Sequence, residues 1–538
     1  MVRGFGRRGL VVLAGVGAAT VGLATHTVAG HADSGYECDG QPQNTVLLVN
    51  HSTGAVTTAT GPGALSTQVG AATSSPATTT GSGSGDTVIA CHGTYTGPIS
   101  IPVGKDNITV RSEDGPNGVT IVGDGSNVPV VSVEANGVAF GGPAEGFTIT
   151  EPKPTGTDLV GIQVGERGAQ STMNEDEQCT TANGAVGSGS GCDQAPPSGV
   201  PINDEVIDNV FQNLLPQNTV YAGKIAGIEL DNTINTTVQQ NLFQNVFGDH
   251  SSISTFSGIV VGTIDQAPGA GAPSSFGTGD STNINVDVLD NSLQNVFQGG
   301  NGSCSSATGI ALNGFVLDTT VYQNLIQQLV NNNNASCITY GIYSNAYGTL
   351  ENEQTGTLAP TNANIDDNRI QQLNNNGPQN AGSTGIYLAP NPAGATPQPP
   401  TPPTACVSGT PPTKCANDSL PPSAYTVVDN ELQQVYTAVD VEALLGANSY
   451  VRDNNFDHDV YGIYNGSAVP PGDANLDGTN NWWGCELNGT SAPPTTITGD
   501  NHGCAANGGN SAATSTQPPQ SESVEQAGDQ AGHNAGNN

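Results

Sequence analysis

A short motif that recurs at irregular intervals constrains the fold of this 538-residue chain more than any other feature. Each copy has a β-branched residue, an Asn three positions later and an apolar residue two positions after the Asn. The seven motif residues are Asn209, Asn241, Asn291, Asn324, Asn368, Asn430 and Asn454. Fixed offsets combined with variable spacing indicate one structural unit that is repeated with insertions between its copies.

A second repeat, a small residue followed by a branched one, makes the spacing interpretable. Its copies are Gly227-Ile228, Gly258-Ile259, Gly309-Ile310, Gly341-Ile342, Gly385-Ile386, Ala438-Val439 and Gly462-Ile463. The shortest circuit through both repeats is about 22 to 24 residues, which fits one coil of a parallel β-solenoid. Coils stack about 4.8 Å apart, so equivalent positions form ladders of like side chains.

The motif Asn is expected to be structural, because stacked amides hydrogen-bond along a solenoid. Asn also tolerates the left-handed conformation of a sharp corner, so we place it at a bend. The branched and apolar motif positions lie five residues apart. Both can face the core only if strand alternation breaks between them, which again predicts a bend.

Composition supports an all-β class. Only 11% of residues are charged, and 72 Gly and 35 Pro argue against long helices. The formal net charge of −36 disfavours nucleic acid and anionic lipid as partners.

Residues 1–32 have the pattern of a signal peptide. Arg3, Arg7 and Arg8 precede an apolar run at 10–23, and small residues follow. The run is shorter than the roughly 20 residues that a membrane-spanning helix needs. The sequence therefore predicts a secreted, extracellular protein without a transmembrane anchor, exported by either a general secretory or a twin-arginine signal.

Ten cysteines follow this segment, and an even number in an exported chain predicts disulfides. They are Cys38, Cys91, Cys179, Cys192, Cys304, Cys337, Cys406, Cys415, Cys485 and Cys504. We expect neighbours in the sequence to pair, because neighbours along a solenoid are neighbours in space.

Three features together resemble the right-handed parallel β-helix proteins of the pectate-lyase-like superfamily. They are the repeats, the segment GDTVIACHGTYTGPISIP at 85–102, which is similar to an opening coil, and NNWWG at 480–484, which is similar to a closing coil. The resemblance implies an all-β, single-stranded right-handed parallel β-helix of about ten coils with inserted loops over residues 85–504. Residues 33–84 would form an N-terminal cap and leader, 391–424 a Pro-rich insertion and 505–538 a disordered tail.

The superfamily's catalytic signatures are absent as sets. Neither the NTD, DD, GHG and RIK group nor RxPxxR occurs, and Asp366-Asp367 is an isolated fragment of the former. Catalytic roles therefore do not transfer from the family.

The residue before each motif Asn supplies the candidate chemistry. Asp367, Asp429 and Asp453 occupy this position in the last three coils. One-coil and two-coil separations of carboxylates resemble those of retaining and inverting glycosidases, and such a row could also bind Ca²⁺. The alternative is a solvated acidic edge.

Arg369 and Arg452 flank these acids in the sequence. A positioned Arg could stabilise the carbanion in elimination from a uronate, or each Arg could merely pair with the adjacent Asp.

Two further groups are candidates for binding. Asp473, Asn475 and Asp477 match the start of a calcium loop whose last ligand is missing, so Ca²⁺ is the one candidate cofactor. Tyr343, Tyr387 and Tyr464 follow the small–branched pairs and should form an outward strip that could bind carbohydrate, although exposed Tyr is also common on sheets.

These observations favour a secreted scaffold that binds a polysaccharide or cell-surface glycan without catalysis. The alternative is a polysaccharide lyase or glycoside hydrolase that uses the carboxylate row.

Overall fold

The computed structural model describes a parallel β-helix, which confirms the predicted fold class. The residues described are 38–74, 85–126, 128–154, 158–165, 200–216, 219–247, 252–262, 282–296, 306–330, 338–349, 358–359, 362–373, 382–389, 424–441, 449–457, 459, 461–465, 476–477, 481–484 and 514–515. The calls on residues 1–32, on the Pro-rich insertion and on most of the tail lie outside these ranges.

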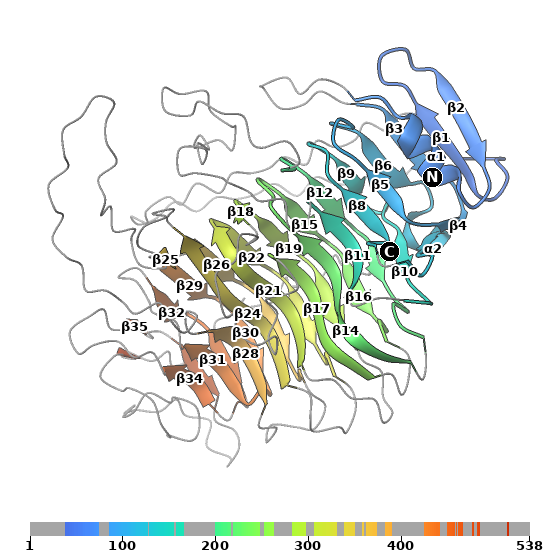
Figure 1. The fold of residues 1–538 in the computed structure, drawn as a ribbon. Helices are drawn as coiled ribbons and strands as arrows, with labels where there is room; N and C mark the ends of the chain where they lie inside the picture. The colour runs from blue at the N-terminus through green and yellow to red at the C-terminus, as the bar shows by residue number, and fades with distance from the viewer. Residues whose placement is uncertain are drawn as a thin grey trace, which may run out of the picture. The chain divides into compact units, whose positions relative to one another are not determined.

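The coils from β3 to β34 each contribute one strand to each of three parallel sheets (Figure 1). Sheet 1 contains, in order along the stack, β3 (Thr87–Ala90), β6 (Thr109–Ser112), β9 (Ala139–Gly141), β12 (Glu205–Ile207), β15 (Thr237–Gln239), β19 (Asp287–Leu289), β22 (Thr319–Tyr322), β26 (Asn362–Asp366), β29 (Ala424–Val428), β32 (Tyr450–Arg452), β35 (Leu476–Asp477) and β37 (Thr514–Ser515).

Sheet 2 follows sheet 1 after a sharp bend in each coil. It contains β4 (Gly93–Thr96), β7 (Val119–Val122), β10 (Thr148–Thr150), β13 (Val210–Phe211), β16 (Leu242–Gln244), β20 (Ser292–Gln294), β23 (Leu325–Gln327), β27 (Arg369–Gln371), β30 (Glu431–Gln433), β33 (Asn455–Asp457) and β36 (Trp482–Gly484).

Sheet 3 completes each coil. Its main path contains β5 (Ile99–Ile101), β8 (Val131–Val133), β11 (Asp158–Val164), β14 (Val220–Leu230), β17 (Ser252–Val261), β21 (Ser306–Leu317), β24 (Ile338–Thr349), β28 (Ser383–Leu388), β31 (Thr437–Val441) and β34 (Tyr461–Asn465). Two short strands pair at its side, β18 (Thr282–Ile284) with β21 and β25 (Leu358–Ala359) with β24.

The repeats occupy the core as predicted. The branched residue of each motif, the apolar residue after the Asn and the branched member of each second-repeat pair are all buried. Aromatic and aliphatic side chains stack from coil to coil, as in the pair Phe211 and Phe243, whose ring centroids lie 4.5 Å apart. Full burial of each such side chain contributes roughly 1.5–3 kcal/mol.

Steric crowding explains why the first position of the second repeat is a small residue. A Cβ built on Gly309 would lie 2.6 Å from the carbonyl oxygen of Gly341 and 2.9 Å from the Ile326 side chain. A larger residue there would push the apolar side chain of sheet 2 out of the core. The glycine therefore sets how closely sheets 2 and 3 approach.

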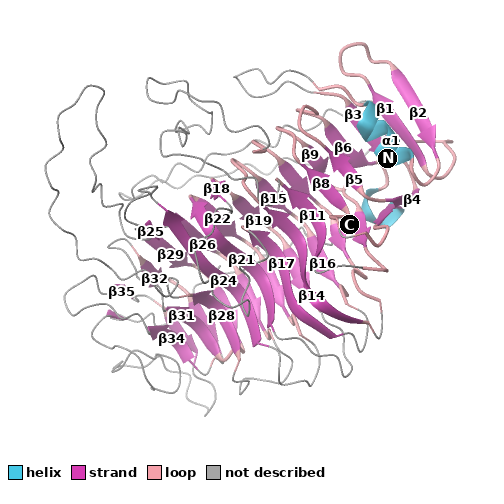
Figure 2. Cartoon of the chain, in the orientation of Figure 1, coloured by secondary structure: helices cyan, strands magenta, loops and turns pink. Residues whose placement is uncertain are grey.

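An antiparallel hairpin and a helix cover the N-terminal end of the core (Figure 2). β1 (Thr45–Val49) pairs with both β2 (Val56–Thr60) and β3, and α1 (Ala64–Ala71) buries Leu65 and Val69. The Lys105 Nζ donates to the carbonyl oxygens of Gly70 and Ala72, at 2.7 and 2.6 Å, and so satisfies the C-terminal end of α1. The second helix, α2 (Gly115–Gly118), lies just before β7.

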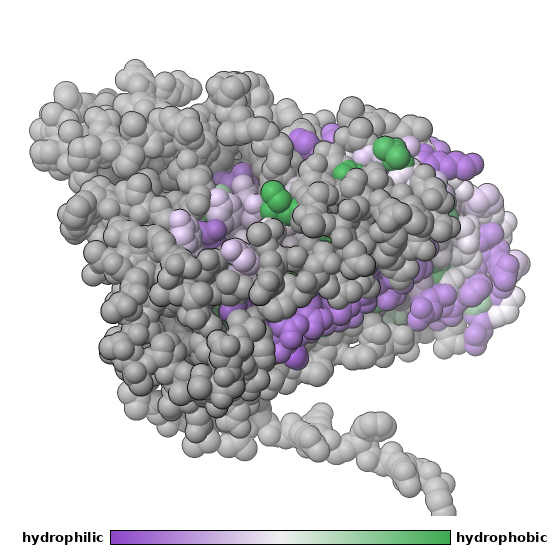
Figure 3. All heavy atoms as spheres, turned by 90° about the horizontal axis from the view of Figure 1, so that it is seen from below, coloured by the Kyte–Doolittle hydropathy of each residue, from purple (hydrophilic) through white to green (hydrophobic). Residues whose placement is uncertain are grey.

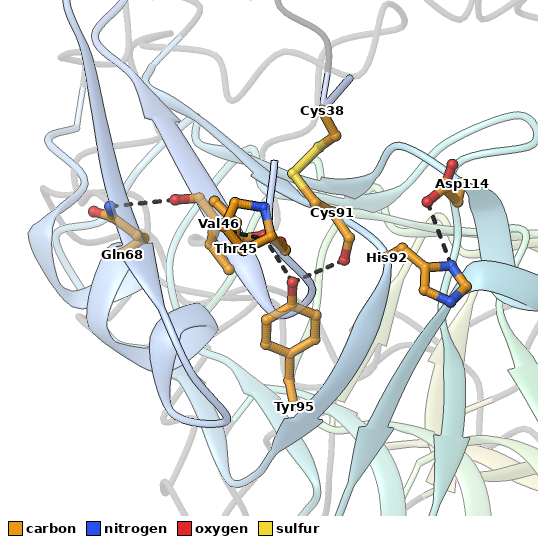
Figure 4. The surroundings of a disulfide bond; sticks show 9 residues. Cys38, Thr45, Val46, Gln68, Cys91, His92, Tyr95 and Asp114 are labelled. Carbon is orange, nitrogen blue, oxygen red and sulfur yellow. Dashed lines mark hydrogen bonds and ion pairs between the residues drawn. A yellow bond between two sulfur atoms is a disulfide. The ribbon is translucent and has the colours of Figure 1, made fainter. Parts of the chain in front are cut away.

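The disulfide Cys38–Cys91 ties the start of the described chain to the first coil (Figure 4). It is the first of the sequential pairs that we predicted, and the other eight cysteines lie outside the described residues. Beside it, the buried Tyr95 hydroxyl lies 2.7 Å from the carbonyl oxygen of Thr45 and 2.8 Å from that of Cys91.

Candidate functional site

The bend between sheets 1 and 2 sets two adjacent columns of side chains in different environments. The inner column is the motif Asn, which is buried in every coil. The residue before it adopts the left-handed conformation, and these residues form what we call the corner column: Asp208, Gln240, Asp290, Gln323, Asp367, Asp429 and Asp453. Our prediction that the Asn itself is left-handed was wrong, because its amide is needed inside the coil.

The Asn column forms a continuous amide ladder, as predicted. The Oδ1 of Asn324 accepts from the backbone N–H and the Nδ2 of Asn291, both at 3.0 Å. Its own Nδ2 donates to the carbonyl oxygen of Val288 at 2.9 Å and lies 3.1 Å from that of Tyr322. The same pattern continues to Asn481, so the ladder reaches the NNWWG segment. Each Asn thus satisfies backbone groups that the bend leaves unpaired.

Five carboxyls gather at the outer side of this bend. They are Asp290, Asp366, Asp367, Asp429 and Asp453, which we call the acidic corner. Asp366 is the last residue of β26, and Tyr322 lies directly across from it in β22. The three catalytic candidates Asp367, Asp429 and Asp453 occupy successive coils, as the sequence predicted.

Two carboxyls of the acidic corner, those of Asp366 and Asp429, hold their protons unusually well. Burial, together with the nearby charges of Asp429 and Asp367, raises the pKa of Asp366 to about 7. Burial and the charges of Asp453 and Asp367 raise the pKa of Asp429 to about 6. Carboxyls that stay partly protonated near neutral pH are typical of sites that transfer protons.

Burial and nearby carboxylates also raise the pKa values of other groups at the acidic corner. Burial raises the pKa of Asp290, even though the Gln239 Nε2 donates to it at 3.2 Å. Burial and four surrounding carboxylates raise the pKa of Tyr322 to about 12. The Gln323 Nε2 donates to Asp367 Oδ2 at 2.8 Å and so holds that carboxylate in place.

The two candidate arginines lie on different sheets, two coils apart. Arg369 begins β27, and its Nε lies 3.2 Å from Oε2 of Glu431 in the next coil. Arg452 ends β32, and its guanidinium carbon lies 3.9 Å above the ring centre of Tyr450. The structure thus places an ion pair on Arg369 and an aromatic ring beneath Arg452.

The predicted tyrosine strip is interrupted. Tyr343 and Tyr387 pair across β24 and β28, but Asp440 separates Tyr387 from Tyr464. Tyr340 joins the first two, and the three ring centroids lie 5.2–5.5 Å apart. Burial raises the pKa of the Tyr343 hydroxyl. This tyrosine cluster is on sheet 3, whereas the acidic corner is at the bend between sheets 1 and 2.

The predicted calcium loop falls mostly outside the described residues. Asp473 and Asn475 are not described, and Asp477 is described only as the end of β35, where its backbone pairs with Tyr450. Within the described ranges, no three His, Cys, Asp or Glu side chains are arranged to hold a metal ion.

Sequence reasoning gave no role to Asp366 or Tyr322. Their column contains Leu289 and Val428 as well, so it shows no repeated residue type.

A second polar column was also missed. Gln294, Gln327 and Gln371 hydrogen-bond in series on the outer face of sheet 2. Gln stands three residues after six of the seven motif Asn residues, and this repeated spacing was the available signal. Figure 3 shows the described residues on one face as mainly hydrophilic, with isolated hydrophobic side chains.

Comparison with protein-family models, with curated proteins and with solved structures finds no match. Among the described residues, no helix is long and apolar enough to cross a membrane.

Proposed function

We propose that this chain is a secreted member of the pectate-lyase-like superfamily that hydrolyses a neutral extracellular polysaccharide at the acidic corner. The superfamily assignment is supported by the parallel coils together with the opening and closing segments. The proposed activity is carried by one observation. Asp366 and Asp429 lie on adjacent coils at the outer side of one bend, with pKa values of about 7 and 6.

Glycoside hydrolysis needs one carboxyl that donates a proton and a second that is ionised. Two carboxyls that repel each other supply this pair, because ionisation of one holds the proton on the other. Asp366, with the higher pKa, protonates the leaving glycosidic oxygen in this scheme. Asp429 or a neighbouring carboxylate of the row then acts as nucleophile or activates water.

Hydrolysis of a neutral chain fits this site better than elimination from a uronate. Elimination needs a cation beside the developing carbanion, and both nearby arginines contact other groups, Glu431 and Tyr450. The net charge of −36 would also repel an anionic polysaccharide.

The test is a depolymerisation screen of neutral and uronate polysaccharides with the Asp366→Asn and Asp429→Asn variants. We expect new reducing ends from a neutral substrate, and a loss of turnover of at least about 100-fold in each variant. Asp318→Asn is the matched control, because Asp318 is an exposed left-handed Asp that is not part of the acidic corner. Equal turnover in all three variants would contradict the assignment, and unsaturated products would indicate a lyase.

A second candidate function is glycan binding without catalysis by the tyrosine cluster. It is favoured by the three rings of Tyr340, Tyr343 and Tyr387 on adjacent coils. A Tyr340/Tyr387 double Ala variant should lose retention on a glycan array while the acidic-corner variants retain it. If the double variant binds every glycan as the parent does, this second function is wrong.

A further inference from the structure

The hairpin turn between β1 and β2 places a serine, a histidine and a carboxylate in series. The Ser52 Oγ lies 3.1 Å from Nε2 of His51, and Nδ1 of His51 lies 3.2 Å from Oδ1 of Asp86. Ser52 is exposed and the Asp86 side chain is only 2% exposed. This order of contacts is that of a nucleophile, its general base and the group that orients the base.

The carboxylate of Asp86 is fixed by several donors besides His51. Its Oδ2 accepts from the backbone N–H and the hydroxyl of Thr73, at 2.8 and 2.7 Å. Its Oδ1 accepts from the backbone N–H of His51 at 3.1 Å and from Nδ2 of Asn50 at 3.2 Å. Burial alone would raise the pKa of Asp86, but these hydrogen bonds lower it, so the group stays ionised.

An ionised Asp86 determines the tautomer of His51. A carboxylate only accepts, so Nδ1 must carry the imidazole proton in the neutral ring. The Nε2 atom is then the acceptor and can take the proton of the Ser52 hydroxyl. Asp86 is a positioning residue in this arrangement, since it acts through His51.

The turn itself is rigid enough to hold the serine in place. The Asn50 Oδ1 accepts from the backbone N–H and the hydroxyl of Thr53, at 3.0 and 2.8 Å. The backbone also closes on itself, with Gly54 N donating to the Asn50 carbonyl at 2.8 Å. Among the described residues no hydrogen bond engages the backbone N–H of Ser52, so that group is available to an oxyanion formed at its own side chain.

We propose that Ser52, His51 and Asp86 form an ester-hydrolysing site that accepts a small acyl group, separate from the acidic corner. The Ser52 oxygen attacks the ester carbonyl carbon while His51 Nε2 takes the hydroxyl proton. The C–O bond to the alcohol breaks and the alcohol leaves with that proton. Water, deprotonated by His51, then attacks the acyl-serine, which releases the carboxylic acid and restores Ser52. The residues of the turn are polar or small and almost all exposed, so they offer little apolar surface against which a long acyl chain could pack. We therefore expect a small acyl group such as an acetyl.

A fluorophosphonate probe on the full chain tests the nucleophile directly, followed by mass spectrometry of the adduct. We expect Ser52 to be labelled at least about 10-fold faster than Ser66, an exposed serine of α1 that serves as the matched control. The His51→Gln variant should lower the labelling rate of Ser52 to about that of Ser66 and leave that of Ser66 unchanged.

The accompanying activity assay is hydrolysis of p-nitrophenyl acetate. Ser52→Ala should abolish the protein-dependent rate, whereas Ser66→Ala should not change it. Circular dichroism of each variant verifies that the fold is kept. Labelling of Ser52 at the rate of Ser66, or labelling that does not depend on His51, would overturn the proposal. Neither outcome bears on polysaccharide cleavage, because the two assays use different substrates and different residues.

Discussion

At each bend between sheets 1 and 2, two consecutive residues meet opposite environments. The motif Asn faces inward, is fully buried and bonds both to its own coil and to its neighbours. The preceding residue is left-handed and half-buried in most coils, and it varies between Asp and Gln. Constancy in the first column follows from packing. Variation in the corner column is possible because its side chains face outward. The carboxylates that lie together in this column repel one another.

The largest loss of stability is expected from a substitution in the inner Asn column. Asn324→Ala should lower the free energy of unfolding by about 3–5 kcal/mol, because it strands the Asn291 amide groups and the Val288 carbonyl inside the solenoid. Denaturant titration measures the loss. Gln323→Ala, one residue earlier at the corner, is the control and should cost about 1 kcal/mol. Similar losses in the two variants would break the comparison.

A slightly smaller effect is expected where sheets 2 and 3 meet. Gly309→Ala should destabilise the fold by about 1–3 kcal/mol, since its Cβ would lie 2.6 Å from the Gly341 carbonyl oxygen. Thr308→Ala, at the adjacent position, removes a buried hydroxyl that has no hydrogen-bond partner among the described residues, and it should change the unfolding midpoint far less. A neutral Gly309 variant would mean that the coils can separate locally without loss.

In the corner column, replacing a carboxyl should stabilise the protein at high pH instead of destabilising it. The raised pKa of Asp429 means that its contribution to stability is fully present below the unfolded pKa near 4 and is lost as the pH rises through about 6. Asp429→Asn should therefore be more stable than the parent at pH 8, by about 1 kcal/mol because solvent screens this half-exposed group. The advantage should vanish near pH 4. Thermal melts at both pH values measure it, and a less stable variant at pH 8 would refute the repulsion.

The smallest effect is expected on sheet 2. The Arg369–Glu431 ion pair is partly exposed, so a double-mutant cycle with Arg369→Gln and Glu431→Gln should give a coupling below about 1 kcal/mol. The coupling should fall further in high salt. A coupling of several kcal/mol that does not depend on salt would show that water screens this ion pair less than its exposed fraction suggests.

The sequence predicted the packing well and the chemistry only in part. Motif positions such as Val321 and Ile326 were predicted to be inward, because every coil repeats them in the same environment. The left-handed residue was assigned one position too late, since Asn suits both a left-handed corner and a buried ladder. Asp366 was given no role because its neighbours in the stack are Tyr322 and Val428, and only the register between coils reveals its proximity to Asp429.

The uninterrupted amide ladder also has an evolutionary consequence. Because Asn324 can take the place of Asn291 against Asn241, loss of residues 291–323 would rejoin the chain in phase and shorten the stack by one coil. Any indel that breaks this phase would turn buried side chains outward. Within the strands and bends, whole-coil duplication and deletion are thus the permitted steps of length change, whereas the loops between them accept insertions of variable length. One such deletion would bring Asp290 into the coil next to Asp367, so that acidic neighbours can arise by recombination without a new point mutation.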